Sequence, residues 1–527
     1  MATRAFALPP RADLRRIAIV GGLALLALLL ALHLAYLLDY VGVALRYPSQ
    51  IDYGEGIVWQ QMRDIMGGRG YGPLGVYPAV VYHYPPLYHA FSAWLAALAG
   101  LDELMAGRLV TLLSTLATVA MMGRLTIALL PRDDAPLVRY GCAAFTGLLF
   151  LSCYPVRMWT PLMRVDMLAG AWGLAGMLMT LRALDRPRWI YGAAVMFTLA
   201  MFTKQISIAP PIAAFGMMIV LRPWVAARGI AFGAVVSLCG LGAMMWATDG
   251  GFLRHLVGYN VNRIDLSLLT TILMPQLMIH SAIIGVGLVG AVMAWRLVRD
   301  RTDKATAGAA AAMLLLFVAL KTVMLLSMMK SGSNYYYVVE WLSGVTMLAG
   351  LACAPWLRRA AGIDGAAPGT GLTSTGLPMA CLMFGLLPLQ LGALYLAMPD
   401  HGVLAELERD RAPIVRLIAA SQRPVIADDM TLLLRAGKPV RWEPAITAEL
   451  GATGVYDQAA FIALVHARCF GFFATEGVFG KPPSTMRYNP PVIAAIRAAY
   501  PVERQIGINR LHLPGGPVDP RRCAGVR

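Results

Sequence analysis

The sequence is poor in charged residues and has no cysteine pattern that would hold a metal. Only 14% of its 527 residues are charged and 58% are hydrophobic, whereas soluble domains carry about 25% charged residues. The seven cysteines include no CxxC pair and no Cys/His metal-ligand spacing. With a mean hydropathy of +0.62, the chain is no ordinary soluble protein, and most of it is expected to lie in lipid.

Apolar segments long enough to cross a bilayer recur through the first 400 residues and are lacking afterwards. About 18 or more apolar residues are needed to cross roughly 30 Å of hydrocarbon. The sequence therefore predicts a polytopic α-helical membrane domain over residues 1–400 and a soluble domain over residues 401–527. The first segment lacks a cleavage site and is expected to be an uncleaved anchor. The eleven predicted spans are 17–38, 109–130, 139–155, 167–184, 189–203, 206–221, 229–248, 271–295, 305–328, 335–357 and 375–397.

The net charge of +16 indicates membrane orientation and not nucleic-acid binding, because the basic residues gather in alternate loops. Cytoplasmic loops of membrane proteins carry an excess of Lys and Arg. The pattern predicts a cytoplasmic N-terminus and a periplasmic C-terminal domain, as in a bacterial inner-membrane protein. The basic groups are Arg4 with Arg11, Arg15 and Arg16; Arg124, Arg132 and Arg139; Arg182, Arg186 and Arg188; Arg222 and Arg228; Arg296, Arg299, Arg301 and Lys304; and Arg358 and Arg359.

Residues 85–100 are apolar for too few positions to make a normal span, which is typical of an interfacial helix. If this segment crossed, the later basic groups would fall on the other side. We therefore expect it to lie at the outer surface, within a first outer loop of about residues 39–108.

The first outer loop contains the motif IDYGEG, with Asp52 and Glu55 close together after the first span. Such a carboxylate pair at a membrane surface suits a base or a metal ligand, although an ordinary solvated acidic loop would look the same. Gly54 and Gly56 are expected to let the backbone turn tightly around the pair. The candidate contacts to a sugar or an acceptor from this loop are Tyr53, His83 and Tyr84.

Two later outer segments contain charged residues of both signs. Arg164 and Asp166 stand at the start of a predicted span; they could simply neutralise one another, or Arg164 could face an anion while Asp166 orients it. Lys204, followed by Gln205, interrupts an apolar run, where a charge is costly and indicates function by default. Its compact ammonium suits a phosphate oxygen, although it could also extend to the interface.

Further polar residues follow in the remaining outer loops. Asn and Tyr side chains can hydrogen-bond and stack on sugars, but the tyrosine run also resembles the aromatic belt of a membrane interface, which we favour for it. The candidates are Asn260, Arg263, Lys330, Asn334, Tyr335 and Glu340.

Four motifs together resemble the GT-C glycosyltransferases, in particular bacterial relatives of the family 39 protein mannosyltransferases and of the lipid A aminoarabinose transferase. They are IDYGEG after the first span, YPPLY, RVD and TKQ, and the resemblance covers roughly residues 15–350. It implies an enzyme that transfers a sugar from a polyprenyl-phosphate donor to a glycan, lipid or protein acceptor at the periplasmic face. Relatives often have adjacent acidic residues where this chain separates Asp52 from Glu55.

The resemblance also implies roles for single residues. Asp52 would be the catalytic base, supported by Glu55 and Asp166, and one displacement would invert the anomeric carbon. The donor phosphate would be bound by Arg164 and Lys204, with Arg263 and Lys330 behind them. No metal is obligatory, although a divalent cation could bridge Asp52 and the phosphate.

The C-terminal region alternates short apolar runs with amphipathic helices, which predicts a small α/β domain. No GxGxxG or GxxxxGK[ST] fingerprint occurs within residues 401–527, so a nucleotide site has no support. Asp428 and Asp429 follow a predicted strand, where a helix cap is favoured over a ligand site. An oxidising compartment would permit a disulfide between Cys469 and Cys523.

Two other functions remain open from the sequence. A lipid-linked sugar transporter or flippase would also place polar residues in its spans, although the charges gather at one face and no inverted repeat is evident. A non-catalytic subunit of an envelope assembly would make Asp52 and Glu55 dispensable.

Overall fold

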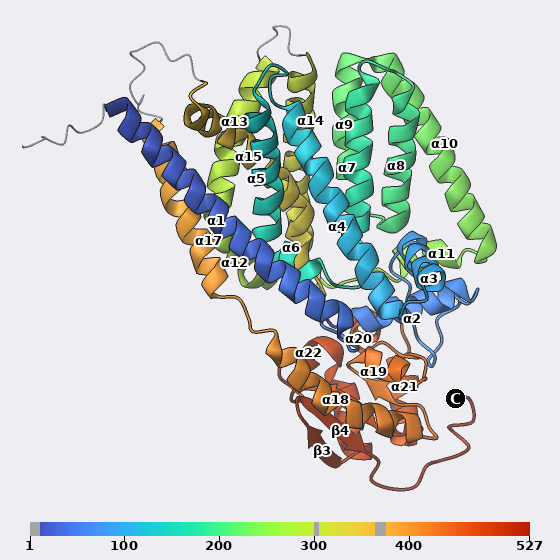
Figure 1. The fold of residues 1–527 in the computed structure, drawn as a ribbon. Helices are drawn as coiled ribbons and strands as arrows, with labels where there is room; N and C mark the ends of the chain where they lie inside the picture. The colour runs from blue at the N-terminus through green and yellow to red at the C-terminus, as the bar shows by residue number, and fades with distance from the viewer. Residues whose placement is uncertain (1–10, 300–304, 364–375, 527) are drawn as a thin grey trace, which may run out of the picture.

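The computed structural model describes residues 11–299, 305–363 and 376–526. A bundle of long helices stands above a smaller domain made of the C-terminal residues (Figure 1). The basic residues Arg4, Arg301 and Lys304, used above to orient the chain, lie outside the described residues.

The bundle is built from helices that coincide with the predicted spans. Its members are α1 (Arg11–Arg46), α4 (Glu103–Ala128), α5 (Pro136–Ser152), α7 (Asp166–Ala183), α8 (Trp189–Thr203), α9 (Ala209–Leu221), α10 (Pro223–Ala247), α13 (Ser281–Arg299), α14 (Ala305–Met324), α15 (Val339–Ala361), α16 (Gly376–Cys381) and α17 (Leu387–Leu396). Seven of the described helices or helical runs are long and apolar enough to cross a membrane. The multi-pass helical fold predicted from the sequence is therefore confirmed.

The count of eleven spans does not follow from the structure. The predicted spans 139–155, 189–203 and 206–221 are helices of 17, 15 and 13 residues, shorter than the roughly 20 residues of an untilted span. The predicted span 271–295 is broken at His280, between α12 (Met274–Ile279) and α13. A π-helical turn at Leu382–Leu386 likewise joins α16 to α17.

Helix α15 occupies the centre of the bundle and α10 its edge (Figure 1). Of the most apolar window of each helix, 89% is buried in α15 and none in α10. Small residues allow the central helices to approach closely: a Cβ on Gly290 of α13 would lie 1.9 Å from the carbonyl oxygen of Leu348 in α15. Such contacts are the usual way in which membrane helices pack.

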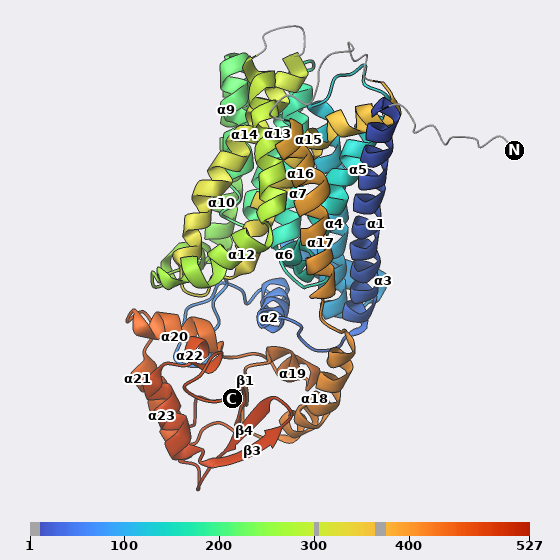
Figure 2. The same ribbon diagram turned by 90° about the vertical axis from the view of Figure 1, so that its left-hand side faces the viewer.

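The first outer loop forms two short helices at the end of the bundle that faces the C-terminal domain. They are α2 (Glu55–Met66) and α3 (Leu87–Ala99), and neither runs the length of the bundle (Figure 2). Helix α3, the predicted interfacial helix, ends at Gly100 in the left-handed conformation and is followed directly by α4. The described members of the basic groups used above for orientation lie near the opposite end, where α1 begins and α4, α7, α9, α13 and α15 finish.

The C-terminal domain has the predicted α/β composition. Its sheet has the order β1-β2-β4-β3, with β1 parallel to β2 and the other pairs antiparallel; the β3–β4 hairpin was not predicted. The disulfide between Cys469 and Cys523 is formed. The elements are α18 (Gly402–Ala420), β1 (Ile426–Ala427), α19 (Met430–Arg435), α20 (Pro444–Ala452), α21 (Gln458–His466), β2 (Phe473–Glu476), α22 (Ser484–Arg487), α23 (Pro490–Ala499), β3 (Val502–Ile506) and β4 (Asn509–Leu513).

The helix-cap interpretation of the Asp428–Asp429 pair is confirmed for Asp429. Its carboxylate accepts a hydrogen bond of 3.1 Å from the amide of Thr431 and caps α19. Asp428 is instead buried and accepts hydrogen bonds from the guanidinium of Arg487 and the hydroxyl of Tyr488.

We expect Cys523→Ser to lower the stability of the C-terminal domain. The disulfide closes a loop across 54 residues, and loss of a native disulfide costs about 2–5 kcal/mol. The thermal midpoint and the protease resistance of the purified protein should both fall. Cys239→Ser, which removes an exposed free cysteine, is the control; equal behaviour of the two variants would contradict the expectation.

Candidate functional site

A fully buried ion pair between Glu55 and Arg108 supports the site. Two of the guanidinium nitrogens donate to the two carboxylate oxygens at 2.8 Å each, and both side chains have no exposed surface. Arg108 also donates to the carbonyls of Ala44, Tyr47 and Ser49 at 2.6–2.8 Å. The pair therefore joins the end of α1, the first outer loop and α4.

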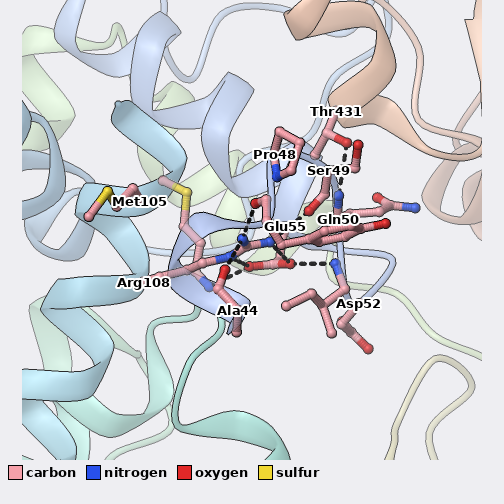
Figure 3. A network of polar contacts seen from close by, with 12 residues as sticks. Ala44, Pro48, Ser49, Gln50, Asp52, Glu55, Met105, Arg108 and Thr431 are labelled. Carbon is pink, nitrogen blue, oxygen red and sulfur yellow. Dashed lines mark hydrogen bonds and ion pairs between the residues drawn. The ribbon is translucent and has the colours of Figure 1, made fainter. Parts of the chain in front are cut away.

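The two Glu55 oxygens are saturated by donors. Besides Arg108, they accept from the amides of Ile51 at 2.7 Å and Met163 at 2.8 Å. Burial alone would raise the pKa of Glu55, but Arg108 and these amides outweigh it and hold the pKa below its usual value. Figure 3 shows Glu55 facing Arg108, with the side chain of Asp52 outside this cluster. Glu55 therefore holds the loops together and does not form a joint pair with Asp52.

Asp52 makes an ion pair with Arg164 from the second outer loop. Both side chains are largely buried, with 22% and 12% of their surface exposed. Burial alone would lower the pKa of Arg164, but Asp52 together with Tyr84 and Tyr336 raises it. The sequence suggested that Arg164 and Asp166 could neutralise one another, but in the structure Arg164 pairs with Asp52.

The two glycines beside Asp52 lie in close contacts, and Gly54 also lies in a tight turn, in which the amide of Glu55 donates to the carbonyl of Asp52 at 3.0 Å. A Cβ on Gly54 would lie 2.2 Å from a guanidinium nitrogen of Arg164, and one on Gly56 would lie 2.7 Å from Cβ of Met430 in α19. Neither glycine has a positive φ. The expected turn is therefore present at Gly54, whereas Gly56 lies inside α2, and both positions also exclude a side chain for lack of space.

A second ion pair joins Asp166, the first residue of α7, to Lys204, directly after α8. The other Asp166 oxygen accepts a 2.9 Å hydrogen bond from the indole of Trp159. Lys204 has 13% of its side chain exposed, so it is held inside the protein and does not extend to the interface.

Aromatic rings connect the two ion pairs. Trp159 stacks on Tyr336 with ring centroids 4.4 Å apart. The guanidinium of Arg164 lies 5.1 Å from the ring centroid of Trp159, and the ammonium of Lys204 lies 5.6 Å from that of Tyr336. Each ring of this stacked pair therefore has one of the two cations close to it. The belt interpretation of the tyrosine run is wrong for Tyr336, because its ring forms part of this cluster.

Tyr84, predicted as a sugar or acceptor contact, lies among the same charges. Burial and the Asp166 carboxylate raise the pKa of its hydroxyl to about 12, while Arg164 and Lys204 oppose the shift. Tyr53 lies on the side of the C-terminal domain, where its hydroxyl accepts a 3.2 Å hydrogen bond from the amide of Ala445.

A small cavity of about 20 Å³, with room for about one water molecule, lies beside the Asp166–Lys204 pair, inside the bundle. Apolar side chains such as Phe150, Leu174 and Phe317 form most of its wall. Two carboxyl groups, those of Asp166 and Glu340, reach the same space. The cavity thus joins the charged cluster to the apolar interior of the bundle.

Other predicted residues are engaged elsewhere. Arg263 is half exposed and binds Glu449 of the C-terminal domain at 3.0 Å, so its assignment to the phosphate is wrong in this arrangement. Glu340, predicted as a sugar ligand, makes an ion pair with Lys321 of α14. Asn260 donates weakly to the carbonyl of Leu256 at 3.4 Å.

Among the remaining predicted residues, Gln205 and Asn334 use their side chains to bond to backbone groups. Gln205 donates to the carbonyl of His83 at 2.8 Å. Burial, with smaller effects of His255 and Lys330, lowers the pKa of His83 to about 4. Asn334 caps the short helix that starts at Tyr335, whose ring lies 5.8 Å from that of Trp159.

Sequence reasoning missed four contributors: Arg108, Trp159, Lys321 and Glu443. Lys321 carried a usable signal, since a lysine within an apolar helix is costly in lipid. The others had none, because their importance depends on partners that are far away in the sequence.

The residues do not fit a metal ion in this arrangement. Asp52 is paired with Arg164, and the described parts of the chain contain no group of three or more His, Cys, Asp or Glu that could hold a metal. We therefore derive no step through a divalent cation.

Comparison with known proteins finds similarity in the fold. No family model and no curated protein matches the sequence. Among solved structures, the chain is similar to ArnT from Cupriavidus metallidurans bound to undecaprenyl phosphate, with a TM-score of 0.57 and 17% identity over 92% of this chain and 99% of that one. It is also similar to the apo form of that protein, at a TM-score of 0.57 and 17% identity over 91% of this chain and 96% of that one.

A second neighbour is the apo oligosaccharyltransferase of Archaeoglobus fulgidus, with a TM-score of 0.50 and 10% identity over 84% of this chain and 69% of that one. ArnT, the lipid A aminoarabinose transferase, and the oligosaccharyltransferase are both GT-C superfamily members. The protein is therefore a multi-pass membrane protein with the GT-C fold, as the sequence motifs suggested.

We expect Glu55→Gln to destabilise the protein strongly. The substitution leaves Arg108 buried without its counter-ion, and breaking a buried pair in this way costs about 3–5 kcal/mol. Glu103→Gln is the matched control, since Glu103 pairs with Arg63 in a part-exposed position where an ion pair contributes about 0–1 kcal/mol. A similar thermal midpoint for the two variants would contradict a structural role for Glu55.

Proposed function

We propose that this protein is an inverting glycosyltransferase, which moves a sugar from a polyprenyl-phosphate donor to an acceptor. The observation that carries the proposal is the arrangement of the carboxylate of Asp52 and the cations Arg164 and Lys204 around one aromatic stack, next to an apolar cavity. The GT-C fold supports it. A charged lipid needs both environments at once, and an inverting sugar transfer needs a base on the side of the anomeric carbon opposite the leaving phosphate.

The two cations suit the phosphate of the donor. Charge-assisted hydrogen bonds from Arg and Lys are the strong contacts to phosphate oxygens. The cavity at Asp166 has mostly apolar walls and holds about one water molecule, so these walls would have to move apart to admit the first part of the lipid. As the anomeric carbon separates from the phosphate oxygen, these cations stabilise the charge that develops on the leaving group.

Asp52 is proposed as the general base. It accepts the proton of the acceptor hydroxyl while that oxygen bonds to the anomeric carbon, and the bond to the lipid phosphate breaks on the opposite side. In the structure Asp52 is paired with Arg164. A donor phosphate that binds Arg164 would compete with this pair and free the carboxylate for the acceptor.

We propose an orientation of the protein in the membrane and a cellular location, which rest on the distribution of the basic residues and on the disulfide. The end of the bundle with the basic groups would face the cytoplasm, and the site with the C-terminal domain would face the periplasm of a bacterial cell. The Cys469–Cys523 disulfide supports this, because disulfides persist in oxidising compartments. The C-terminal domain would close the site on the acceptor side.

We expect Asp52→Asn to abolish transfer while the donor still binds. In reconstituted membranes with radiolabelled polyprenyl-phosphate sugars and native envelope extract, loss of the base should lower the rate about 10²- to 10⁴-fold. Asp265→Asn is the control, since Asp265 is exposed in another outer loop. Undiminished transfer by Asp52→Asn would remove Asp52 from the mechanism.

Lys204→Gln should weaken donor binding about 10- to 100-fold, because a hydrogen bond to a charged group contributes about 1.5–3 kcal/mol. The substitution also leaves the buried Asp166 carboxylate without its counter-ion, which lowers stability, so binding is measured below the thermal midpoint of the variant. Arg263→Gln, at a cation that Glu449 engages, should leave binding unchanged. Binding to a polyprenyl phosphate is measured with purified protein, and the assignment is refuted if only the Arg263 variant loses affinity.

A further inference from the structure

Glu443 is a carboxyl group of the C-terminal domain that the mechanism above does not use. It stands directly before α20, but its side chain makes no cap hydrogen bond to that helix. Pro444 has no amide hydrogen to offer, and the next amide, that of Ala445, donates to the hydroxyl of Tyr53. The Glu443 side chain is therefore not engaged by the helix that it precedes.

Glu443 is also buried without a full set of partners. Only 7% of the residue is exposed, and its Oε2 atom has no hydrogen-bond partner among the described residues. A buried polar atom without a partner costs free energy. Such an atom is expected where a ligand completes the contact.

The surrounding backbone is held firmly, so the unpartnered oxygen does not result from a loose loop. The amide of Ala79 donates to the carbonyl of Arg441 at 2.7 Å, and Ala79 also forms a parallel bridge with Trp442. On the other side, the hydroxyl and the amide of Thr447 donate to the carbonyl of Glu443 at 2.7 and 3.2 Å.

The groups around Glu443 belong to the site. From the bundle side, the guanidinium of Arg164 acts on its carboxyl. From the first outer loop, Tyr53 lies close enough for the carboxyl to influence its hydroxyl, and behind Tyr53 stand Arg487, 4.3 Å from the ring centroid, and Asp428. Burial raises the pKa of Glu443 to about 8, and Arg164 lowers it only in part. Below that pH the carboxyl is neutral and carries a hydrogen that it can donate.

We propose that Glu443 is an acceptor-binding residue, whose neutral carboxyl donates a hydrogen bond to an oxygen of the acceptor beside Asp52 and Arg164. This inference rests on the proposed glycosyltransferase function. The donor lipid would reach the site from the bundle, where its phosphate would meet Arg164 and Lys204. Glu443 approaches from the opposite side, where α20 lies beneath the bundle (Figure 2), so it faces the second substrate.

The first test compares Glu443→Gln with Glu443→Ala in the label-transfer assay. Glutamine keeps a neutral donor, so transfer at pH 7 should stay near the wild-type rate. Wild-type activity should fall as pH rises through about 8, because the carboxyl ionises and loses its hydrogen, and Glu443→Gln should lack this fall. Alanine should raise the apparent KM for the envelope extract about 2- to 10-fold and leave that for the donor unchanged.

Several outcomes would overturn the proposal. Unchanged pH profiles and KM values in both variants would make Glu443 structural. Loss of transfer in Glu443→Gln, as in Asp52→Asn, would show that Glu443 acts as an ionised base. A changed KM for the donor would show that Glu443 contacts the donor and not the acceptor. If wild-type protein transfers no label, the proposed function fails as well, whereas these three outcomes leave that function intact.

A second measurement needs no activity. Infrared difference spectra of the purified protein during a pH titration should show a carboxylic acid band that disappears near pH 8 and is absent from Glu443→Gln. Absence of that band from the wild type would show that Glu443 is ionised at neutral pH and would refute the neutral-donor role.

Discussion

The buried ion pair between Glu55 and Arg108 is the constraint on which the rest of the site depends. Taking two charges out of water is costly, and the cost is offset only when further hydrogen bonds satisfy the remaining atoms. Here the carbonyls at the end of α1 and the amides of Ile51 and Met163 do so. Because Asp52 follows Ile51 and Arg164 follows Met163, the same contacts bring together the proposed base and the cation proposed to bind the phosphate.

The C-terminal domain forms the other half of the site and is tied to the same loop. The amide of Gln50 donates to the hydroxyl of Thr431 at 3.0 Å, and Arg411 donates to the carbonyl of Gln50 at 3.2 Å. Arg263 binds Glu449 on another side of the domain. Glu443 is placed by this docking, so a separate domain contributes a carboxyl to a site that otherwise belongs to the membrane bundle.

The sequence predicted which residues share one end of the molecule, because alternate loops of a multi-pass protein lie on one side. Asp52, Arg164, Asp166 and Lys204 do lie together in the structure. It did not predict their partners: Arg164 pairs across 112 positions with Asp52 and not with its neighbour Asp166. Which charged side chains pair with one another depends on the packing of helices that are distant in the sequence, and no local sequence pattern predicts that packing.

The residues that were missed or misassigned show the same limit. Arg263 resembled a phosphate ligand in an outer loop, yet Glu449 of another domain engages it. Glu443 precedes a proline at the start of a helix, and nothing in that local pattern marked it. Its significance comes from burial beside Arg164, which follows only from the docking of the two domains. The apolar patterns, in contrast, located the helices well, because hydropathy acts locally.

The central claim is that this protein breaks the bond between a sugar and a lipid phosphate and forms a new glycosidic bond. The most direct test supplies reconstituted vesicles and envelope extract with a polyprenyl-phosphate sugar that carries one radiolabel in the sugar and another in the phosphate. We predict that the sugar label moves to the acceptor while the phosphate label stays with the lipid. Movement of both labels together across the membrane, with no bond broken, would contradict the account and identify a flippase.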